Sequence, residues 1–383
     1  MTETGRPPQA GIELSWAHCI PTVSRIDILK VAVACSAAQT RSPKEIIVVD
    51  ASPDWEAHER ELRELLAGTA IRLVVIPAQE RSAAFQRNQA LDHVTADVVL
   101  FTDDDSLLFP DYAERTLAIF ERDPDQRIVG VGGNLVADFP PVAARMLGLH
   151  DGSNVPAALE QKDTGTRKVA RLAGFLEENL KIWPWIRKEI LMMSMERMFV
   201  PYDEGRPGNA DRVAGIMGSD EGYLSDYLPG GSMAIRSPVA KAERFNSYLL
   251  GYSPCEDLDV SYRYGRHGAC VIIHASRQHH YEVAASRASR YLATLLGVSN
   301  VAFFIRVNSA DPSRLEGRYW IFVARRLLGE TIKDVVARRF EFPQVRGILG
   351  AIPLAYRIFR RDRRDVSAWY KEQQRALIAA RRR

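Results

Sequence analysis

Three consecutive carboxylates follow an apolar run in the first third of the chain. Asp103, Asp104 and Asp105 come shortly after residues 97–101, Asp-Val-Val-Leu-Phe. Carboxylates held together at the end of a buried strand repel one another, which raises their pKa values and opposes folding unless a cation or solvent compensates. Mg²⁺ and Mn²⁺ prefer oxygen ligands and leave positions open for substrate phosphates. The cluster therefore indicates a divalent metal site, although a strand-to-loop turn would also favour Asp here.

A second acidic group lies far along the chain. Glu256, Asp257 and Asp259 precede Val-Ser-Tyr-Arg263. An acidic side chain at a helix N-terminus caps free amides and complements the helix dipole. One cap would suffice, so three acids together favour a chemical role for at least one of them.

The elements that must position these acids are readable from the hydrophobic pattern. Between residues 15 and 133, short Val/Ile-rich runs bounded by turn residues alternate with longer amphipathic segments. This pattern predicts strands at 16–20, 45–49, 71–75, 98–102 and 128–132, and helices at 27–38, 55–66, 82–91 and 111–122. Alternating strands and helices predict an α/β fold with a mostly parallel central sheet covered on both faces. Ligands of such sheets bind outside the carboxyl ends of the strands, where Pro21, Thr22, Asp50 and residues 103–105 fall.

The remainder of the chain divides into three further parts. Residues 1–14 are expected to be a disordered lead that precedes the alternating half at 15–139. Residues 140–288 are expected to form a second half with a helical insertion at 140–226, a loop at 201–220 and a strand at 269–274. Four methionines of the insertion indicate adaptable core packing; they are Met192, Met193, Met195 and Met198. Residues 289–383 are expected to be a basic helical extension.

Composition limits the class of protein. The 383 residues are 46% hydrophobic and carry a net charge of +3, which is ordinary for a globular chain. The four cysteines are scattered and predict neither a disulfide framework nor a zinc site. The N-terminus does not resemble a secretory signal, so we expect a cytoplasmic location. The uncharged stretch at 291–305 is shorter than the roughly 20 residues of a spanning helix, so no transmembrane segment is expected.

Positive charge is concentrated at the C-terminal end. Residues 318–383 hold 17 Lys and Arg against 6 Asp and Glu. Aromatic residues are interleaved with these basic residues, which suits helices lying on the anionic inner face of a cytoplasmic membrane. A basic tail packed against an acidic body is a second interpretation, and nucleic acid binding is a third, less favoured one.

The order of the motifs resembles family 2 glycosyltransferases, which have the GT-A fold. The resemblance runs from about residue 15 to 280. Its parts are Ile20-Pro-Thr22 at a first strand end, Lys44 to Asp50 as a second strand, Arg87-Asn88 on a helix, Asp103-Asp-Asp105 as the Asp-x-Asp metal motif, Pro229 to Arg236 as a glycine-containing strand, and Glu256 to Arg263 as the Glu-Asp helix. No single motif is decisive, but the ordered set is specific.

The resemblance implies a role for each matching residue. Asp257 would be the catalytic base, with Glu256 tuning it or orienting the acceptor. Pro21, Thr22, Asp50, Arg87 and Asp103 would contact the nucleotide of the donor. Gly230, Gly231 and Ser232 would line the substrate, the glycines allowing close approach of the backbone. Asp103, Asp105 and His280 would hold Mn²⁺ or Mg²⁺, with His279 as the alternative histidine.

The implied activity is metal-dependent, inverting transfer of a sugar from a nucleoside-diphosphate sugar to a hydroxyl of a glycan or lipid-linked acceptor, as in polysaccharide or cell-envelope biosynthesis. Asp104 is expected either to lie behind the residues that contact the metal or to face solvent. Arg263 is expected to brace Asp259. The resemblance makes residues 15–139 the nucleotide-sugar-binding half and residues 140–288 the acceptor-binding half. The sequence departs from the family pattern at two places. Asp50-Ala-Ser-Pro in place of Asp-Asp-Gly-Ser leaves the base contact and the nucleotide identity open, and the loop that begins at Arg81 leaves the phosphate contacts open. A nucleotidyltransferase on a similar fold and a non-catalytic binding module are the alternatives.

Overall fold

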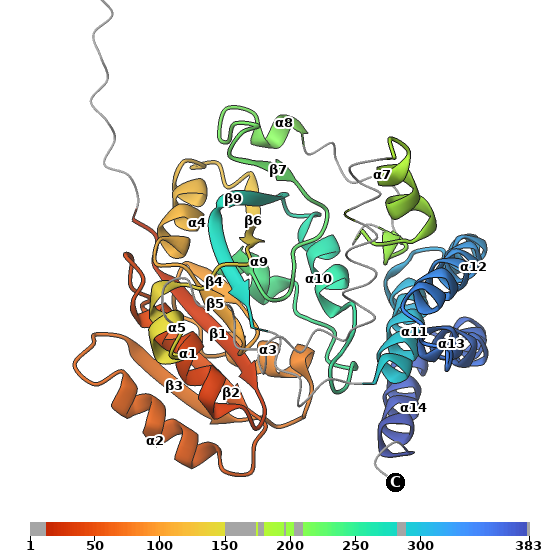
Figure 1. Ribbon diagram of the computed structural model, residues 1–383, viewed down its shortest axis with the longest axis horizontal. Coiled ribbons are helices and arrows are strands. Elements are labelled where there is room, and N and C mark those ends of the chain that lie inside the picture. Colours follow the sequence, from red (N-terminus) through yellow and green to blue (C-terminus); the bar gives the residue numbers. More distant parts are fainter. Residues whose placement is uncertain are drawn as a thin grey trace, which may run out of the picture.

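A computed structural model of the chain describes residues 13–149, 174, 180–194, 197–202, 210–281 and 289–380. Most of the expected disordered lead, Met195 and much of the expected helical insertion lie outside these residues. The described part folds around one nine-stranded sheet, with a group of C-terminal helices gathered beyond α10 (Figure 1).

The sheet is mixed, but most of its strands point the same way. Its spatial order is β3 (Arg72–Pro77), β2 (Glu45–Asp50), β1 (Trp16–Thr22), β4 (Val98–Phe101), β8 (Met233–Arg236), β6 (Ile128–Leu135), β9 (Ala269–His280) and β5 (Ser106–Leu108), with β7 (Gly222–Leu224) also paired to β9. β1 pairs in parallel with β2 and β4, β2 with β3, and β6 with β9, whereas β5, β7 and β8 run antiparallel to their neighbours. The mostly parallel sheet expected from the sequence is confirmed.

Among the described residues, seven helices accompany this sheet, and the first four of them lie where the alternating pattern predicts helices. They are α1 (Ile26–Ala37), α2 (Trp55–Leu65), α3 (Ala83–Leu91), α4 (Tyr112–Glu121), α5 (Pro141–Met146), α9 (Ser237–Ala242) and α10 (Glu256–Tyr264). The first four match their predicted ranges to within a residue at each end. The one-residue difference at the start of α3 has a local cause. The Ser82 side chain accepts a hydrogen bond from the Phe85 amide at 3.2 Å, so Ser82 is the N-cap of α3 and not its first helical residue.

Short elements occupy the described parts of the region between α5 and β8. They are α7 (Trp183–Trp185), a π-helical turn (Ile186–Ile190) and α8 (Ala210–Val213). Met192 is buried and belongs to the main hydrophobic core, and Met198 packs against that core. Met193 is 44% exposed, so the expectation that the methionines pack in a core is wrong for this one.

Four helices complete the chain: α11 (Arg290–Asn308), α12 (Pro312–Val336), α13 (Pro343–Arg360) and α14 (Val366–Ala380). They confirm the expected helical character of this region. α11 and α13 approach closely at Gly347, where an added Cβ would lie 2.6 Å from the backbone oxygen of Tyr291. Buried residues of all four helices belong to the same core cluster as β1 and β4, so the extension packs on the body rather than extending into solvent.

One helix within the described residues has the length and composition of a membrane span. It is α11, with 19 residues, a mean hydropathy of 1.3 and 67% of its most apolar window buried inside the protein. The expectation that this stretch is too short to span a membrane is therefore wrong as to length, because the helix extends beyond the uncharged residues 291–305. Its burial is what the core helix of a globular protein shows, so its apolar residues have a partner without a bilayer.

Candidate active site

The acidic groups that are distant in sequence meet at one edge of the sheet. Asp103–Asp105 follow β4, and Glu256 and Asp257 form the first turn of α10. Arg87, on α3, connects the two groups. Its guanidinium lies 2.8 Å from an Asp103 carboxylate oxygen and 2.5 Å from a Glu256 oxygen, and it donates to the Gly230 carbonyl at 3.3 Å. The two acidic clusters of the sequence thus form one site.

Arg87 is only 1% exposed, which makes it an unusual cation. A buried guanidinium is costly unless it is paired and hydrogen-bonded. Its pairing with two carboxylates, and its contact at 5.3 Å with the ring of Phe245, compensate this cost. Despite burial, the nearby Glu256 and Asp103 charges keep the pKa of Arg87 raised, so the side chain stays cationic.

The Glu256 and Asp257 carboxyls both bind protons more tightly than usual. Burial, assisted by the neighbouring Asp257 charge, raises the pKa of Glu256 to about 8 although Arg87 opposes the shift. Burial also raises the pKa of Asp257, against hydrogen bonds from the Gly230 amide at 3.1 Å and the Leu258 amide at 2.9 Å. Because Glu256 and Asp257 are adjacent and both lie near the Arg87 guanidinium, we infer that they titrate as a coupled pair, each with its pKa raised by burial.

Gly230 is fitted tightly between these groups. A Cβ added there would lie 3.2 Å from the Asp257 Cβ and 3.3 Å from Arg87 Nη2. At Gly231, an added Cβ would lie 3.0 Å from Ser106 Oγ and 3.5 Å from Asp103 Oδ2. The backbone of this segment therefore lies between the two acidic groups. Contact of Gly230, Gly231 and Ser232 with a substrate stays a prediction. Ser232 is fully buried, and its amide donates to the Pro229 carbonyl.

Asp104 is the most buried of the three consecutive acids, so the expectation that it could face solvent is wrong. Arg25 lies 2.5 Å from one of its oxygens, and Thr22 donates to the other at 2.6 Å. The same guanidinium reaches Asp105 at 3.0 Å. Burial still raises the pKa of Asp104 to about 7. Asp104 and Arg25 therefore hold the turn in place, and Arg25 is a site residue that the sequence analysis missed.

The residues expected to hold a metal ion converge. One ligand atom from each of Asp103, Asp105 and His280 lies within 4.8 Å of the others. Asp105 is 4% exposed, and its carboxylate lies 3.0 Å from His280 Nε2. His279 points elsewhere, because its ring packs on Phe139 with 3.9 Å between centroids. Two carboxylates and one imidazole fit a Mn²⁺ or Mg²⁺ ion, so the structure favours His280 of the two histidines.

Asp50 lies at the end of β2, next to Pro21 and Thr22 at the end of β1. Its carboxylate is 1% exposed and fully engaged by neighbours. One oxygen accepts from the amide and hydroxyl of Ser52, and the other lies 2.6 Å from His58 Nδ1. His58, on α2, was not expected from the sequence. Contact of Asp50 with a nucleotide base stays a prediction.

The C-terminal helices support the start of α10. Asn300 of α11 donates to the Pro254 carbonyl at 2.7 Å, and Tyr370 of α14 donates to Asn300 at 2.6 Å. Pro254 is two residues before Glu256. Asp259 is braced by Arg263 at 3.1 Å, as expected, and also by Asn308 at 2.9 Å. The predicted helical extension thus positions the turn that carries the acidic pair.

The first half of this arrangement matches a known family. Residues 18–145 match the family model described as glycosyl transferase family 2. We call residues 18–145 the family 2 segment, because they are the part of the chain that this family model matches. The match covers β1 to α5 and includes Arg87 and the three consecutive acids. It confirms, for this segment, the resemblance seen in the sequence. A comparison with curated protein sequences finds no match.

Solved structures resemble the chain at a distance. The mannosyltransferase PcManGT from Pyrobaculum calidifontis, solved with GDP-Man and Mn²⁺, is 16% identical over 96% of this chain and 86% of its own, with a TM-score of 0.46. TarS 1–349 from S. aureus is 12% identical over 90% of both chains, with a TM-score of 0.42, and its complex with UDP has a TM-score of 0.41.

Proposed function

We propose that the protein is a metal-dependent, inverting glycosyltransferase that moves a sugar from a nucleoside-diphosphate sugar to a hydroxyl of a glycan or lipid-linked acceptor. The observation that carries the proposal is the bridge made by Arg87 between Asp103 and Glu256. It joins the acidic cluster of the family 2 segment to the acidic pair on α10, outside that segment. A leaving-group side and an acceptor side are thereby fixed relative to each other.

The chain's own groups suit the two sides of such a reaction. Asp103, Asp105 and His280 would hold Mn²⁺ or Mg²⁺, which when bound would neutralise charge on the leaving diphosphate. Asp257, which is only half-buried, would accept the proton of the acceptor hydroxyl as that oxygen bonds to the anomeric carbon and the bond to the diphosphate breaks. Attack from the face opposite the leaving group inverts the configuration at that carbon.

Glu256 and Arg87 would tune the base. The Glu256 side chain lies against Arg87 and next in sequence to Asp257, so its protonation state alters the proton affinity of Asp257. Hydrogen bonds from the Gly230 and Leu258 amides hold both Asp257 oxygens in a fixed orientation. A fixed base needs little reorganisation when an acceptor hydroxyl arrives.

The test is Asp257→Asn, with Asp92→Asn as the control. Asn cannot accept the proton, so transfer should fall by about 10²–10⁴-fold. Thermal stabilisation by Mn²⁺ with UDP, GDP or dTDP should be retained, because those ligands would bind on the other side of Arg87. Asp92 forms an exposed ion pair with Arg244 at 2.6 Å, and its substitution should change neither property. Retained turnover in Asp257→Asn would remove Asp257 as the base.

The same assay separates the alternative activity. Release of a nucleoside diphosphate on transfer supports glycosyl transfer, whereas release of pyrophosphate would identify a nucleotidyltransferase. A protein that no nucleotide stabilises with Mn²⁺ would instead fit a binding module.

We also propose that the protein associates peripherally with the anionic inner face of the cytoplasmic membrane through the outer face of α12. Four aliphatic residues are exposed there at helical spacing: Ile321, Leu328, Ile332 and Val335. They share one side of the helix, and Arg318 and Arg338 are exposed near its two ends. An apolar stripe between basic residues is typical of an interfacial helix.

Part of the basic charge has acidic partners within the protein. Lys371 and Arg375 of α14 lie 2.9 Å and 3.2 Å from Glu80, which supports the interpretation of a tail packed on the body for that helix. The membrane proposal therefore concerns α12. Flotation with vesicles containing phosphatidylserine should be lost in Ile321→Glu/Leu328→Glu and kept in the control Gly317→Ala. Equal flotation of both variants would refute it.

A further inference from the structure

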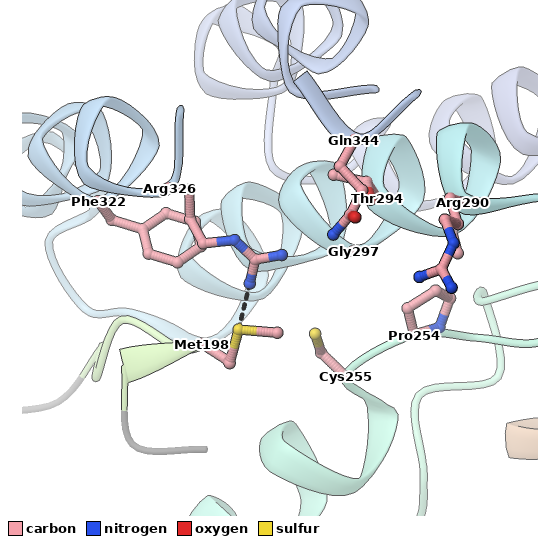
Figure 2. Close-up of a pocket in the computed structure, with 10 residues that line it drawn as sticks. Met198, Pro254, Cys255, Arg290, Thr294, Gly297, Phe322, Arg326 and Gln344 are labelled. Carbon is pink, nitrogen blue, oxygen red and sulfur yellow. Dashed lines mark hydrogen bonds between the residues drawn. The ribbon is translucent and has the colours of Figure 1, made fainter. Parts of the chain in front are cut away.

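A cavity of about 230 Å³ lies behind the start of the α10 helix and is shared by α11, α12 and α13 (Figure 2). Pro254 and Cys255, the residues just before Glu256 and Asp257, form one wall. Gly297 of α11 faces them, and an added Cβ there would lie 3.5 Å from the Pro254 Cβ and 3.8 Å from the Cys255 sulfur. The cavity therefore adjoins the segment that carries the acidic pair.

The charges around the cavity are positive. Arg290 and Arg326 line it, and none of its described lining residues is acidic. In Figure 2 the Arg290 and Arg326 side chains lie on opposite sides of Cys255. The amide side chain of Gln344 adds a neutral hydrogen-bonding group. An anionic ligand would be attracted to this cavity, and a cationic one repelled.

Arg326 is buried and only partly satisfied. It is 7% exposed, and one terminal nitrogen lies 3.2 Å from Glu330. The other terminal nitrogen contacts the thioether sulfur of Met198, a weak acceptor. The Nε hydrogen has no hydrogen-bond partner within the described part of the chain. A buried guanidinium that lacks strong acceptors is costly, and an anionic oxygen in the cavity would supply them.

Glu330 does not cancel the positive charge of this region. The same carboxylate also lies 2.8 Å from Lys333, and Gln344 donates to it. Glu330 is thus shared between two cations, and the neighbouring Asp334 is paired with Arg339 at 3.7 Å. Arg326 and Arg290 place one guanidinium on each of two walls of the cavity. Two guanidinium groups suit a phosphoryl group, which carries between one and two negative charges.

The remaining walls are apolar. Phe322, Met198, Pro254 and Ala293 line the cavity beside the arginines. A free phosphate would leave these surfaces without a partner, whereas a phosphoryl group attached to a hydrocarbon chain would cover them.

We propose that this cavity binds the phosphoryl group and first hydrocarbon units of a lipid phosphate, the charged part contacting Arg290 and Arg326 and the apolar part contacting Phe322 and Met198. The inference rests on the proposed function, because it assigns the acceptor class of the same site. It places the lipid phosphate next to the turn that orients Asp257.

Cys255 gives a local measurement of occupancy. Of the four cysteines, Cys19, Cys35 and Cys270 are buried and Cys255 is partly exposed, so a small neutral thiol reagent should modify Cys255 selectively. Burial raises the pKa of this thiol to about 12, so labelling is slow and is best followed at about pH 8.5 over hours, by mass spectrometry of the tryptic peptide. A ligand in the cavity should slow it.

The probes are farnesyl phosphate, farnesol and inorganic phosphate, each with the full-length protein. Farnesyl phosphate should slow Cys255 labelling by at least about tenfold at saturation and raise the melting temperature. Farnesol and inorganic phosphate should each protect much less. Equal protection by farnesol would refute the proposed contact of a phosphoryl group with the arginines. Equal protection by inorganic phosphate would refute the proposed contact of a hydrocarbon chain with the apolar walls.

Three variants locate the effect. Arg290→Gln, at an exposed residue, and Arg326→Gln should each weaken protection by about tenfold, the loss of one charged contact. Gly297→Leu should abolish it by filling the cavity from α11. The control Arg115→Gln removes the same charge from an exposed residue of α4 that does not line the cavity, and it should leave protection unchanged. Protection that persists in Arg290→Gln and Gly297→Leu would refute the proposal even if Arg326→Gln fails to fold.

Stabilisation by Mn²⁺ with UDP, GDP or dTDP, measured on the same samples, separates this inference from the proposed function. If a nucleotide stabilises the protein but farnesyl phosphate does not protect Cys255, only the lipid phosphate site is wrong. If no nucleotide stabilises the protein, the proposed function fails, whatever the cavity binds.

Discussion

Replacing Arg87 by Met should destabilise the protein in a strongly pH-dependent way. The substitution keeps an apolar chain of similar length but removes the only cation that touches both Asp103 and Glu256 among the described residues. Breaking a buried ion pair by removing one partner costs about 3–5 kcal/mol, because the other partner stays buried and charged. For Asp103 the cost is smaller, since its side chain is 40% exposed.

Protonation limits this cost at low pH. The pKa of Glu256 is already about 8 with Arg87 present, and removing the guanidinium raises it further. At pH 6 the variant therefore buries a neutral carboxyl, whereas at pH 9 it must bury a charge or take up a proton. For each pH unit between these states, the free energy of unfolding of the variant changes relative to wild type by up to about 1.4 kcal/mol. We expect the full 3–5 kcal/mol only near pH 9, and about 1–2 kcal/mol less at pH 6.

Thermal unfolding measures the difference. A chain of 383 residues has an unfolding entropy of roughly 0.8 kcal/mol/K, so 3–5 kcal/mol lowers the melting temperature by about 4–6 °C at pH 9. The control is Arg236→Met. Arg236 is also buried, but it donates at 2.9–3.1 Å to the backbone carbonyls of Phe120, Asp123 and Ile128, which do not titrate, and its contact with the Asp123 carboxylate is longer, at 3.4 Å. Its loss should destabilise the protein similarly at both pH values.

A double substitution checks the mechanism. Adding Glu256→Gln to Arg87→Met removes the stranded carboxylate, so at pH 9 the pair of changes should cost at least about 1 kcal/mol less than the sum of the single costs. Equal destabilisation of Arg87→Met at pH 6 and pH 9, together with additivity in the double variant, would refute the coupling between Arg87 and Glu256.

Three further predictions concern the same site. Between about pH 4.5 and pH 8, Glu256 is protonated in the folded state and ionised in the unfolded state, so its contribution to stability falls as pH rises through that window. Glu256→Gln should therefore flatten the pH dependence of the melting temperature, and an unchanged slope would contradict the raised pKa. Asp105→Asn should weaken Mn²⁺ stabilisation by at least about tenfold, which titration by thermal shift measures, and undiminished Mn²⁺ affinity would exclude Asp105 as a ligand. Gly230→Ala should lower kcat by about tenfold or more with little change in melting temperature, because the added Cβ would displace Asp257 by a few tenths of an ångström. The control is Gly317→Ala, whose Cβ meets nothing within 4 Å. Wild-type turnover of both variants would show that Asp257 tolerates the shift.

Local pattern was sufficient for the elements that carry the family 2 segment. β1, β2 and β4 are runs of buried Val, Ile and other apolar residues, and the helices between them show the 3.6-residue period, so their positions follow from short stretches of sequence. β5 and β7 were missed. Each has three residues, too few to show alternation, and each exists because β9 offers hydrogen bonds to it.

Residues with a side chain that acts through a distant partner were also missed. Arg25 gave no signal, because its partners Asp104 and Asp105 lie about eighty positions away. Asn300, which supports the carbonyl of Pro254, looks from the sequence like an ordinary polar residue in an apolar helix. Long-range pairing of this kind depends on how the elements pack, which a single sequence does not encode locally.

The sequence by itself determined the identity and order of the acids and the sheet that carries the first of them, because residue type and hydrophobic period are local properties. Tertiary structure alone decided how these acids are used. It buried Arg87 between Asp103 and Glu256, removed Asp104 from solvent, and placed His280, rather than His279, beside Asp105. The physical reason is that burial and charge pairing set pKa values and ligand geometry, and both depend on neighbours that come from distant parts of the chain.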